Sequence, residues 1–448
     1  MSTTDTDLND QYDNVALRAH PKARSQAVAR HRIHLLTDII KVEALATILL
    51  PDEKGKRCDA CFHHPPRRNN SPPLKRCSGC AAYWYCNTRC QVNHWNLCHK
   101  GMCKQFPRYH ASEAYTNLPP HQKLDALLLS HLVAGHPSQE HANNSLSTFL
   151  SLLPHNPSTA VHPPICAFSG KRTPTAEFVN HLFERFENNN FVIHSHLVST
   201  GHGIFPLASR LFNHSCAPNA VVAFISENCN VSMIVRPLRV INEGEEITIP
   251  YIDPALPFHR RRQILELSYG FSCRCSSCML SQSIRIINSP VDFKGLETPL
   301  IDFVFSKSPE KLPEAQCLSS LPKSLHHMLH ELCLPHLSAT FSDHSHDGPY
   351  TTALHVGRSL LALYCVVYPP NYPQIGMHCL EMAKTAWNKY TTEEFSSDSS
   401  QRFITLENAR MYLRMGEAVL SIMGPEGDIE GGPLEEISTL KPLLVGSE

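Results

Sequence analysis

The sequence of 448 residues has little net charge and no long apolar run, and its first residues are neither basic nor strongly apolar. Because a membrane-spanning helix needs about 18 consecutive apolar residues, the sequence predicts no membrane span. Residues 1–5 lack the basic and apolar regions of a secretory signal peptide, so we expect no such peptide. The formal net charge of -1 gives no general attraction to polyanions, so nucleic acid binding would need a local basic patch.

The sequence does have a globular composition with many cysteines. Its residues are 42% apolar and 18% charged, and its length allows about two to four domains. Most of the 18 cysteines cluster with metal-ligand spacing in a large chain without a secretion signal. Such clusters are typical of thiolates in a reducing compartment, so we expect the protein in the nucleus, the cytoplasm or both.

Residues 58–103 contain four pairs of zinc-ligand residues. The pairs are Cys58 and Cys61, Cys77 and Cys80, Cys86 and Cys90, and His99 and Cys103. The spacing within each pair lets two side chains reach one tetrahedral ion. Because the segment is rich in Arg, His and Pro, it has too little apolar material to fold without metal. Eight ligands therefore predict two zinc ions.

The seventh ligand of this segment has two competitors. His99 keeps a three-residue spacing to Cys103, which favours it. His94 keeps the same spacing to Cys98, but that pairing leaves Cys103 unused. We prefer His99 and keep Cys98 and His94 as alternatives.

Three later stretches supply a second group of candidates. Residues 211–219 hold a polar Asn-His-Ser-Cys run before a proline, and residues 244–251 have the pattern of a turn and a strand that ends on a tyrosine. Residues 271–278 hold three thiols, and Cys216 can be the fourth ligand of the same ion. The set Cys216, Cys273, Cys275 and Cys278 predicts a closed structural zinc site, which ties two distant segments together.

Taken in this order, the motifs resemble those of the SET and MYND domain-containing protein lysine methyltransferases. Tyr85-Cys86, Trp95 and His99-Lys100 are similar to the MYND zinc finger of that family. The resemblance implies an α+β fold, with a β-rich SET domain split by a MYND finger, a helical insertion and a helical C-terminal domain similar to tetratricopeptide repeats. The implied parts are the first SET part at 1–57, the finger at 58–103, the insertion at 104–189, the core SET domain at 190–270, the cysteine zinc site at 271–280 and the helical domain at 281–448.

The resemblance also implies the reaction and the groups that perform it. The activity would be N-methylation of a protein lysine, in a histone or another protein, with S-adenosylmethionine as cofactor. Asn213 and His214 resemble residues that bind the cofactor, Tyr251 resembles the catalytic tyrosine that also contacts the cofactor, and Phe271 resembles the aromatic residue that packs on it. The finger would bind protein partners.

The resemblance further implies how the finger ligands are shared. The two finger ions would be held by interleaved pairs, namely Cys58, Cys61, Cys86 and Cys90 for one and Cys77, Cys80, His99 and Cys103 for the other. With the site at Cys216, the expected content is three zinc ions.

Residues 22–25 give rise to an alternative hypothesis. The family has a glycine-containing turn at this place, since only glycine lets the backbone come so close to the cofactor, and this sequence has no glycine there. A second hypothesis is therefore a catalytically weak or inactive SET-fold adaptor whose MYND finger binds other proteins. A third, nucleic acid binding through Arg67, Arg68, Lys75 and Arg76, is disfavoured by the nearly neutral overall charge.

Hydrophobic periodicity and turn residues predict the elements around these motifs. We expect short strands within 27–50, a strand pair over 220–225 and 231–235, and a strand over 246–251. Helices are expected over 121–133, over 144–153 with a cap at Asn144, from a cap at Thr173, and over 257–269, 354–364, 375–390 and 405–422. We also expect a turn over 201–206, a solvated arginine face at 260–262 and a frayed tail from Gly424.

Overall fold

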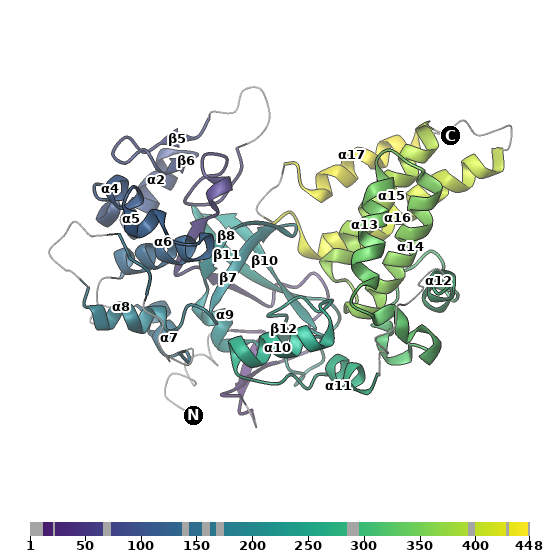
Figure 1. Cartoon of the computed structure of the whole chain (residues 1–448), viewed down its shortest axis with the longest axis horizontal. Helices are drawn as coiled ribbons and strands as arrows, with labels where there is room; N and C mark the ends of the chain where they lie inside the picture. The colour runs from purple at the N-terminus through teal and green to yellow at the C-terminus, as the bar shows by residue number, and fades with distance from the viewer. Residues whose placement is uncertain are drawn as a thin grey trace.

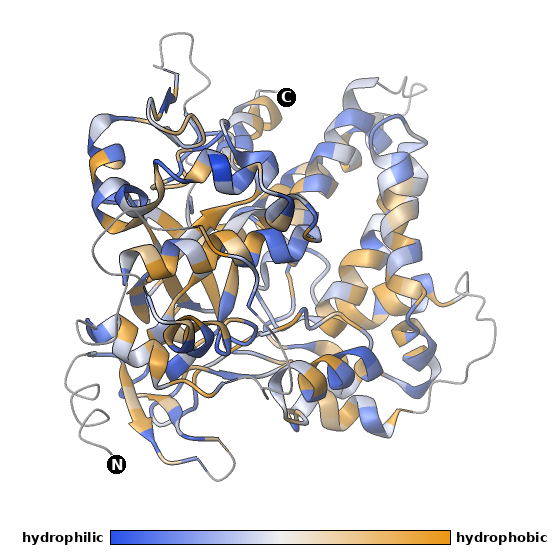
Figure 2. Cartoon of the chain, turned by 60° about the vertical axis from the view of Figure 1, so that its left-hand side comes forward, coloured by the Kyte–Doolittle hydropathy of each residue, from blue (hydrophilic) through white to orange (hydrophobic). Residues whose placement is uncertain are grey.

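The chain consists of a β-rich body, with small helices on one side of it, and a bundle of long helices on the other side (Figure 1). The computed structural model describes residues 12–20, 23–65, 73–136, 143–154, 162–166, 174–284, 295–392, 399–426 and 430–446. Strands and helices are both abundant, which confirms the predicted α+β class. Apolar residues concentrate in the central strands, while the long helices mix apolar and polar residues (Figure 2).

The predicted short strands within 27–50 are present. β1 (Val15–Arg18) and β2 (Gln26–Ala29) form an antiparallel hairpin. β3 (Ile40–Glu43) and β4 (Ala46–Leu49) join two different three-stranded sheets. This N-terminal segment therefore adds one edge strand to each sheet, whose other strands come from residues 190–237.

The first of these sheets has the order β10-β11-β3. β10 (Ala220–Glu227) and β11 (Asn230–Pro237) are the predicted strand pair, and both are longer than expected. Only Asn228 and Cys229 connect them, with φ of 50° and 66°. Two successive residues with positive φ match the right-handed twist of a tight hairpin.

The second sheet, of order β4-β8-β7, corrects the expected turn over 201–206. β7 (Asn190–Ser195) and β8 (Val198–Ile204) are antiparallel, so Gly201 and Gly203 lie within the central strand. A Cβ atom on Gly201 would overlap the Ile48 carbonyl oxygen and the Phe62 ring. The glycines therefore allow close packing in a strand, rather than a change of direction.

A short parallel pair joins the two later motifs. β9 (Asn213–His214) pairs with β12 (Thr248–Ile249). The expected strand over 246–251 is thus only two residues long, and Tyr251 follows it. Gly244 has φ of 76°, in agreement with the turn predicted there.

Small helices and a two-stranded ribbon lie within residues 51–183, and one more short helix follows β8. They are η1 (Pro51–Glu53), β5 (Lys75–Arg76), β6 (Trp84–Tyr85), α2 (Thr88–His94), η2 (Trp95–His99), α3 (Lys100–Met102), α4 (Phe106–His110), α5 (Glu113–Thr116), α6 (Pro120–Gly135), α7 (Asn144–Leu150), α8 (Ala176–Phe183) and α9 (Pro206–Leu211). The helix predicted over 121–133 is α6.

Two of the expected helix starts are wrong by one or two residues. Asn143, not Asn144, caps α7 by accepting from the backbone N–H of Leu146 at 2.8 Å. Thr175 caps α8 by accepting from Phe178, whereas Thr173 lies outside the described residues. Several residues of each sequence can provide a capping oxygen, and tertiary packing selects one of them.

The helix predicted over 257–269 is α10 (Phe258–Tyr269), which ends at Gly270 with φ of 71°. The solvated face expected at 260–262 is wrong for its middle residue. Arg261 is only 5% exposed and donates through Nη1 to the carbonyl oxygens of Pro254, at 2.9 Å, and Leu256. α11 (Ser276–Ser283) follows α10 after the cysteine-rich turn.

The C-terminal bundle contains the three predicted amphipathic helices as α14 (Tyr350–Val367), α15 (Pro373–Thr392) and α16 (Ser399–Met423). The remaining elements of the bundle are α12 (Glu297–Phe305), η4 (Cys317–Ser320), η5 (Lys323–Leu329), α13 (Cys333–Ser345) and α17 (Pro433–Val445). No helix among the described residues is long and apolar enough to cross a membrane.

The frayed tail expected from Gly424 is wrong for most of its length. α17 buries Ile437, Leu440 and Leu444. Glu426 is 4% exposed and its carboxylate accepts from the backbone N–H of His196 in the β-rich body. The segment after α16 therefore anchors the helical bundle to the sheet, and burial of the apolar side of α17 holds the end of the described chain in place.

Candidate functional site

The polar run at 213–216 lies where the N-terminal hairpin meets the β9–β12 pair. Asn213 Nδ2 donates to the backbone oxygen of Ser25 at 2.9 Å and to Glu246 Oε1 at 2.8 Å. Arg210 Nη1 also donates to Ser25 Oγ, at 2.5 Å. The segment without glycine near residue 23 is therefore held directly against Asn213.

His214 and Tyr251 are joined through main-chain and side-chain contacts. The Tyr251 N–H donates to His214 Nδ1 at 3.0 Å, and the Tyr251 hydroxyl donates to the Phe212 carbonyl oxygen at 2.6 Å. Burial raises the pKa of Tyr251 above its ordinary value, so the side chain stays a neutral phenol at physiological pH. The position of the hydroxyl is thus fixed by the backbone that precedes Asn213.

Half-buried aromatic rings form a wall beside these residues. The ring of Tyr251 lies 5.0 Å from that of Tyr269, and Tyr269 lies 6.4 Å from Phe271. The His214 ring is 5.3 Å from Tyr251 and 6.0 Å from Phe271. Sequence reasoning identified Phe271 and overlooked Tyr269, although Tyr269 precedes it by only two residues at the end of α10.

The four thiols expected to share one ion come together beside this wall. The sulfur atoms of Cys216, Cys273, Cys275 and Cys278 all lie within 4.8 Å of one another, and those of Cys216 and Cys278 are 3.5 Å apart. A tetrahedral zinc ion with bonds of about 2.3 Å places its sulfur ligands roughly 3.8 Å apart. The thiol set therefore fits zinc and has no open position.

The finger ligands also come together in two sets of four. Cys58, Cys61, Cys86 and Cys90 form one set, and Cys77, Cys80, His99 and Cys103 form the other. His99 Nε2 lies 3.4 Å from Cys77 Sγ and 3.5 Å from Cys80 Sγ. Burial lowers the pKa of His99 to about 4, so its imidazole is neutral, as a metal ligand must be.

A π-helical turn explains why His99, and not His94 or Cys98, joins the second set. η2 spans Trp95–His99 with π-helical geometry, which holds more residues per turn than an α-helix. The wider turn rotates His99 toward Cys77 and Cys80. His94 and Cys98 are left in a separate group, where the thiol lies 3.2 Å from His94 Nε2.

Comparison with known proteins identifies the family. The family model for the SET domain matches residues 28–252, which is half of the chain. The chain belongs to the SET domain family. Its matched region contains residues 58–189, Asn213, His214 and Tyr251, and ends before α10 and the cysteines at 273–278.

Curated relatives of this SET protein are lysine methyltransferases by name. The chain is 28% identical over 248 residues to histone-lysine N-methyltransferase ASHR1 of Arabidopsis thaliana, covering 50% of this chain and 46% of the relative. It is 28% identical over 268 residues to N-lysine methyltransferase SMYD2 of Gallus gallus, and this match covers 55% of this chain and 57% of the relative. It is 29% identical over 267 residues to SMYD2 of Homo sapiens, and that match covers 57% of each chain. The chain thus spans about half the length of the curated relatives it matches.

These relatives agree with the SET and MYND resemblance that the motifs predicted. One solved structure that matches is the SET domain of LSMT bound to lysine and AdoHcy. The match spans 97% of this chain and 92% of the solved chain, with 14% identity and a TM-score of 0.25.

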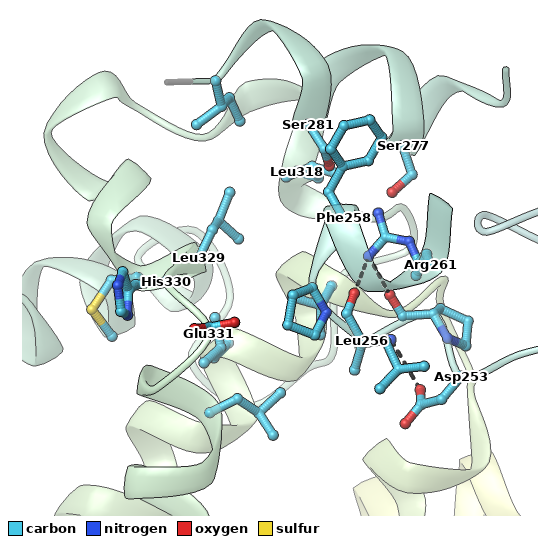
Figure 3. Close-up of a pocket in the computed structure, with 18 of the residues that line it drawn as sticks. Asp253, Leu256, Phe258, Arg261, Ser277, Ser281, Leu318, Leu329, His330 and Glu331 are labelled. Atoms are coloured by element: carbon cyan, nitrogen blue, oxygen red, sulfur yellow. Dashed lines mark hydrogen bonds between the residues drawn. The ribbon is translucent and has the colours of Figure 1, made fainter. Parts of the chain in front are cut away.

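The SET core and the C-terminal bundle enclose a cavity of about 210 Å³ just beyond Tyr251. Residues 253–258 and α10 form one side, and the bundle supplies Leu329, His330 and Glu331 to the other (Figure 3). The Arg261 side chain points toward residues 253–257 and holds this loop by its hydrogen bonds to the carbonyl oxygens of Pro254 and Leu256 (Figure 3). The walls are largely apolar, with the carboxylates of Asp253 and Glu331 among the lining side chains.

Proposed function

We propose that this SET protein is an S-adenosylmethionine-dependent protein lysine N-methyltransferase that acts on a histone or another protein. The observation that carries the proposal is Tyr251, whose backbone binds His214 and whose hydroxyl binds the main chain next to Asn213. The named activity of the relatives supports the same reaction class.

The aromatic wall suits the cofactor. When bound, S-adenosylmethionine supplies a methyl group on a positively charged sulfur. The faces of aromatic rings attract such a cation. Three rings are available here, because the ring centroid of Tyr269 lies 5.0 Å from that of Tyr251 and 6.4 Å from that of Phe271. Asn213 and His214, on the neighbouring strand, would bind the polar parts of the cofactor.

Tyr251 would position the amine of the substrate. Because its hydrogen is donated to Phe212, the oxygen keeps its lone pairs for an incoming N–H. The lysine must be neutral to act as a nucleophile, and a poorly hydrated site lowers the pKa of an amine. The aromatic surroundings of Tyr251 exclude water, so they favour the neutral form.

A transfer assay tests this proposal. Purified protein is incubated with cofactor carrying a labelled methyl group and a mixed protein extract. Wild type should label at least one protein, and Tyr251→Phe should reduce the rate about 100-fold or more, because the positioning oxygen is lost. Tyr412→Phe is the matched control, since it removes another buried tyrosine hydroxyl, in α16, far from the site. Labelling by wild type no greater than by Tyr251→Phe would overturn the proposal.

The second candidate function is a SET-fold adaptor with weak or no activity, and the segment at residues 23–25 favours it. This segment has no glycine, and Ser25 lies against Asn213. Calorimetric titration with S-adenosylmethionine separates the two functions. A micromolar dissociation constant, about -8 kcal/mol, supports the enzyme, whereas no heat at millimolar cofactor supports the adaptor.

Zinc, partners and location complete the proposal. The three ligand sets would each hold one zinc ion, the finger would bind protein partners, and the protein would act in the nucleus or cytoplasm. Metal analysis tests the zinc content. Affinity capture with wild type and with Cys61→Ser tests whether the finger binds partners, and microscopy of the tagged protein tests its location.

A further inference from the structure

A fourth group of ligand side chains lies between the finger and the helical insertion. His94, Cys98 and His131 come from α2, η2 and α6, and their exposed fractions are 6%, 8% and 4%. One nitrogen of each imidazole and the thiol sulfur all lie within 4.8 Å of one another. None of the three belongs to the zinc sets described above.

The hydrogen bonds of both imidazoles orient them as metal ligands. His131 Nδ1 lies 2.8 Å from the Thr47 carbonyl oxygen, which can only accept, so Nδ1 carries the proton and Nε2 has a lone pair. His94 Nδ1 lies 2.9 Å from the Tyr85 hydroxyl, while its Nε2 faces Cys98. An oxygen partner on the far nitrogen is the usual support for a histidine that binds metal.

A phenol lies beside two members of the group, His131 and His94. The Tyr83 hydroxyl lies 2.8 Å from His131 Nε2, and the Tyr83 ring lies 5.4 Å from the ring of His94. The nearby Lys54 forms an ion pair with Asp59, so these two charges offset each other. A divalent ion would therefore meet one thiolate, two neutral nitrogens and a polarisable hydroxyl.

We propose that His94, Cys98 and His131 bind a fourth metal ion, a zinc ion in tetrahedral coordination, with Tyr83 at the fourth position. Zinc bonds of about 2.0 Å to nitrogen and 2.3 Å to sulfur place such ligands about 3.5 Å apart. The distance of 3.2 Å between His94 Nε2 and Cys98 Sγ is close to this value. Imidazole with thiolate is a donor set that zinc prefers over calcium or magnesium.

The role of this ion would be structural. All its ligands are buried, so no substrate can reach the metal. His131 belongs to α6 and its second nitrogen binds Thr47 in β4, whereas His94 and Cys98 belong to the finger. The ion would therefore fasten the finger to the SET sheet and to α6, and it is independent of the proposed methyl transfer.

Native mass spectrometry of the full-length protein, purified without chelators, tests the proposal by counting metal ions in the folded chain. We expect four zinc ions in wild type and three in Cys98→Ala. Cys166→Ala is the matched control, because Cys166 is also a buried thiol and belongs to none of the ligand groups found among the described residues. This control should retain four ions.

Wild type with only three ions, or Cys98→Ala with four, would overturn the proposal. The contacts among Tyr83, His94, Cys98 and His131 would then be a metal-free hydrogen-bond network. If Cys98→Ala fails to fold, the zinc count of wild type decides. X-ray absorption at the zinc edge supports that count by measuring the average share of nitrogen among the zinc ligands. This share is higher with the fourth site, since the three other sets contain only one histidine. Neither measurement depends on methyltransferase activity.

Discussion

At the scale of single residues, the motifs predicted candidate side chains but not what they contact. Asn213 and Tyr251 could be predicted as candidates because they stand in a recognisable order with Cys216 and Phe271. Their partners could not, because Ser25 is 188 residues from Asn213 and Phe212 binds through its backbone. A main-chain partner leaves no signature in the sequence, so the position of the Tyr251 hydroxyl had to come from the structure.

Asn213→Ala should weaken cofactor binding about tenfold or more. The change leaves the Ser25 carbonyl and the Glu246 carboxylate without a donor, so residues 23–25 no longer have a fixed position against the β9–β12 pair. Calorimetric titration with S-adenosylmethionine measures the loss. Asn14→Ala is the control, because Asn14 also donates to backbone oxygens, those of Asp38 and Ile39, in the N-terminal part of the chain. Equal affinity of Asn213→Ala and wild type would show that this bridge does not shape the cofactor pocket.

Arg261 is a residue that sequence analysis interpreted wrongly. Three consecutive arginines suggested a solvated face, but Arg261 precedes the buried Leu265 by four residues and so shares its side of α10. We expect Arg261→Ala to lower the free energy of unfolding by about 2 kcal/mol, since one buried and one partly buried carbonyl group lose a charged donor. Arg260→Ala, at an exposed position, should change it by less than about 0.5 kcal/mol. Urea unfolding of both variants checks this, and similar midpoints would contradict it.

At the scale of elements, long periodic segments were predictable and short ones were not. α14, α15 and α16 bury apolar residues over many turns, and such long apolar segments leave a strong helical pattern. The β12 pairing is only two residues long, too short for any alternation. α17 did carry a pattern in Ile437, Leu440 and Leu444, but the glycines before it suggested a tail.

The glycines of β8 offer a test of close packing in a strand. Gly201→Ala should destabilise the fold by about 2 kcal/mol or more, because the new Cβ would overlap the Ile48 carbonyl oxygen and the Phe62 ring, and backbone cannot move aside cheaply. Gly295→Ala is the control, since a Cβ there meets nothing within 4 Å. Thermal unfolding compares the two variants. A Gly201→Ala protein as stable as wild type would mean that β8 has more room than its glycines indicate.

At the scale of the whole molecule, candidate metal ligands and single polar contacts connect parts that are far apart in sequence. The set at Cys216 joins the Asn213 loop to the segment after α10, while Glu426 joins the helical bundle to β7 and its turn. The cysteine set was predictable because three thiols lacked a fourth. The Glu426 contact was not, because its partner lies 230 residues away and a single glutamate carries no pattern.

The two kinds of zinc site should therefore differ in what their loss disturbs. All ligands of the two finger sets lie within residues 58–103, and the finger touches the sheet through contacts such as that of Asn93 with Asn230, at the far end of β10 and β11. Cys216, in contrast, lies two residues from His214, and its Sγ is 3.2 Å from His214 Nε2. Losing the ion at Cys216 must disturb the Asn213 loop, whereas losing a finger ion need not reach it.

Cys275→Ser should lose one zinc ion and abolish measurable cofactor binding, while the finger ions remain. Cys61→Ser should lose finger metal and keep much of the cofactor affinity, because all four ligands of its set lie within residues 58–103. Metal analysis and cofactor titration are made on the same preparations of both variants and of wild type. Normal cofactor binding by Cys275→Ser would show that the Cys216 site does not support the pocket. A wild-type content near one zinc ion per chain would show that the finger ligands are wrongly assigned.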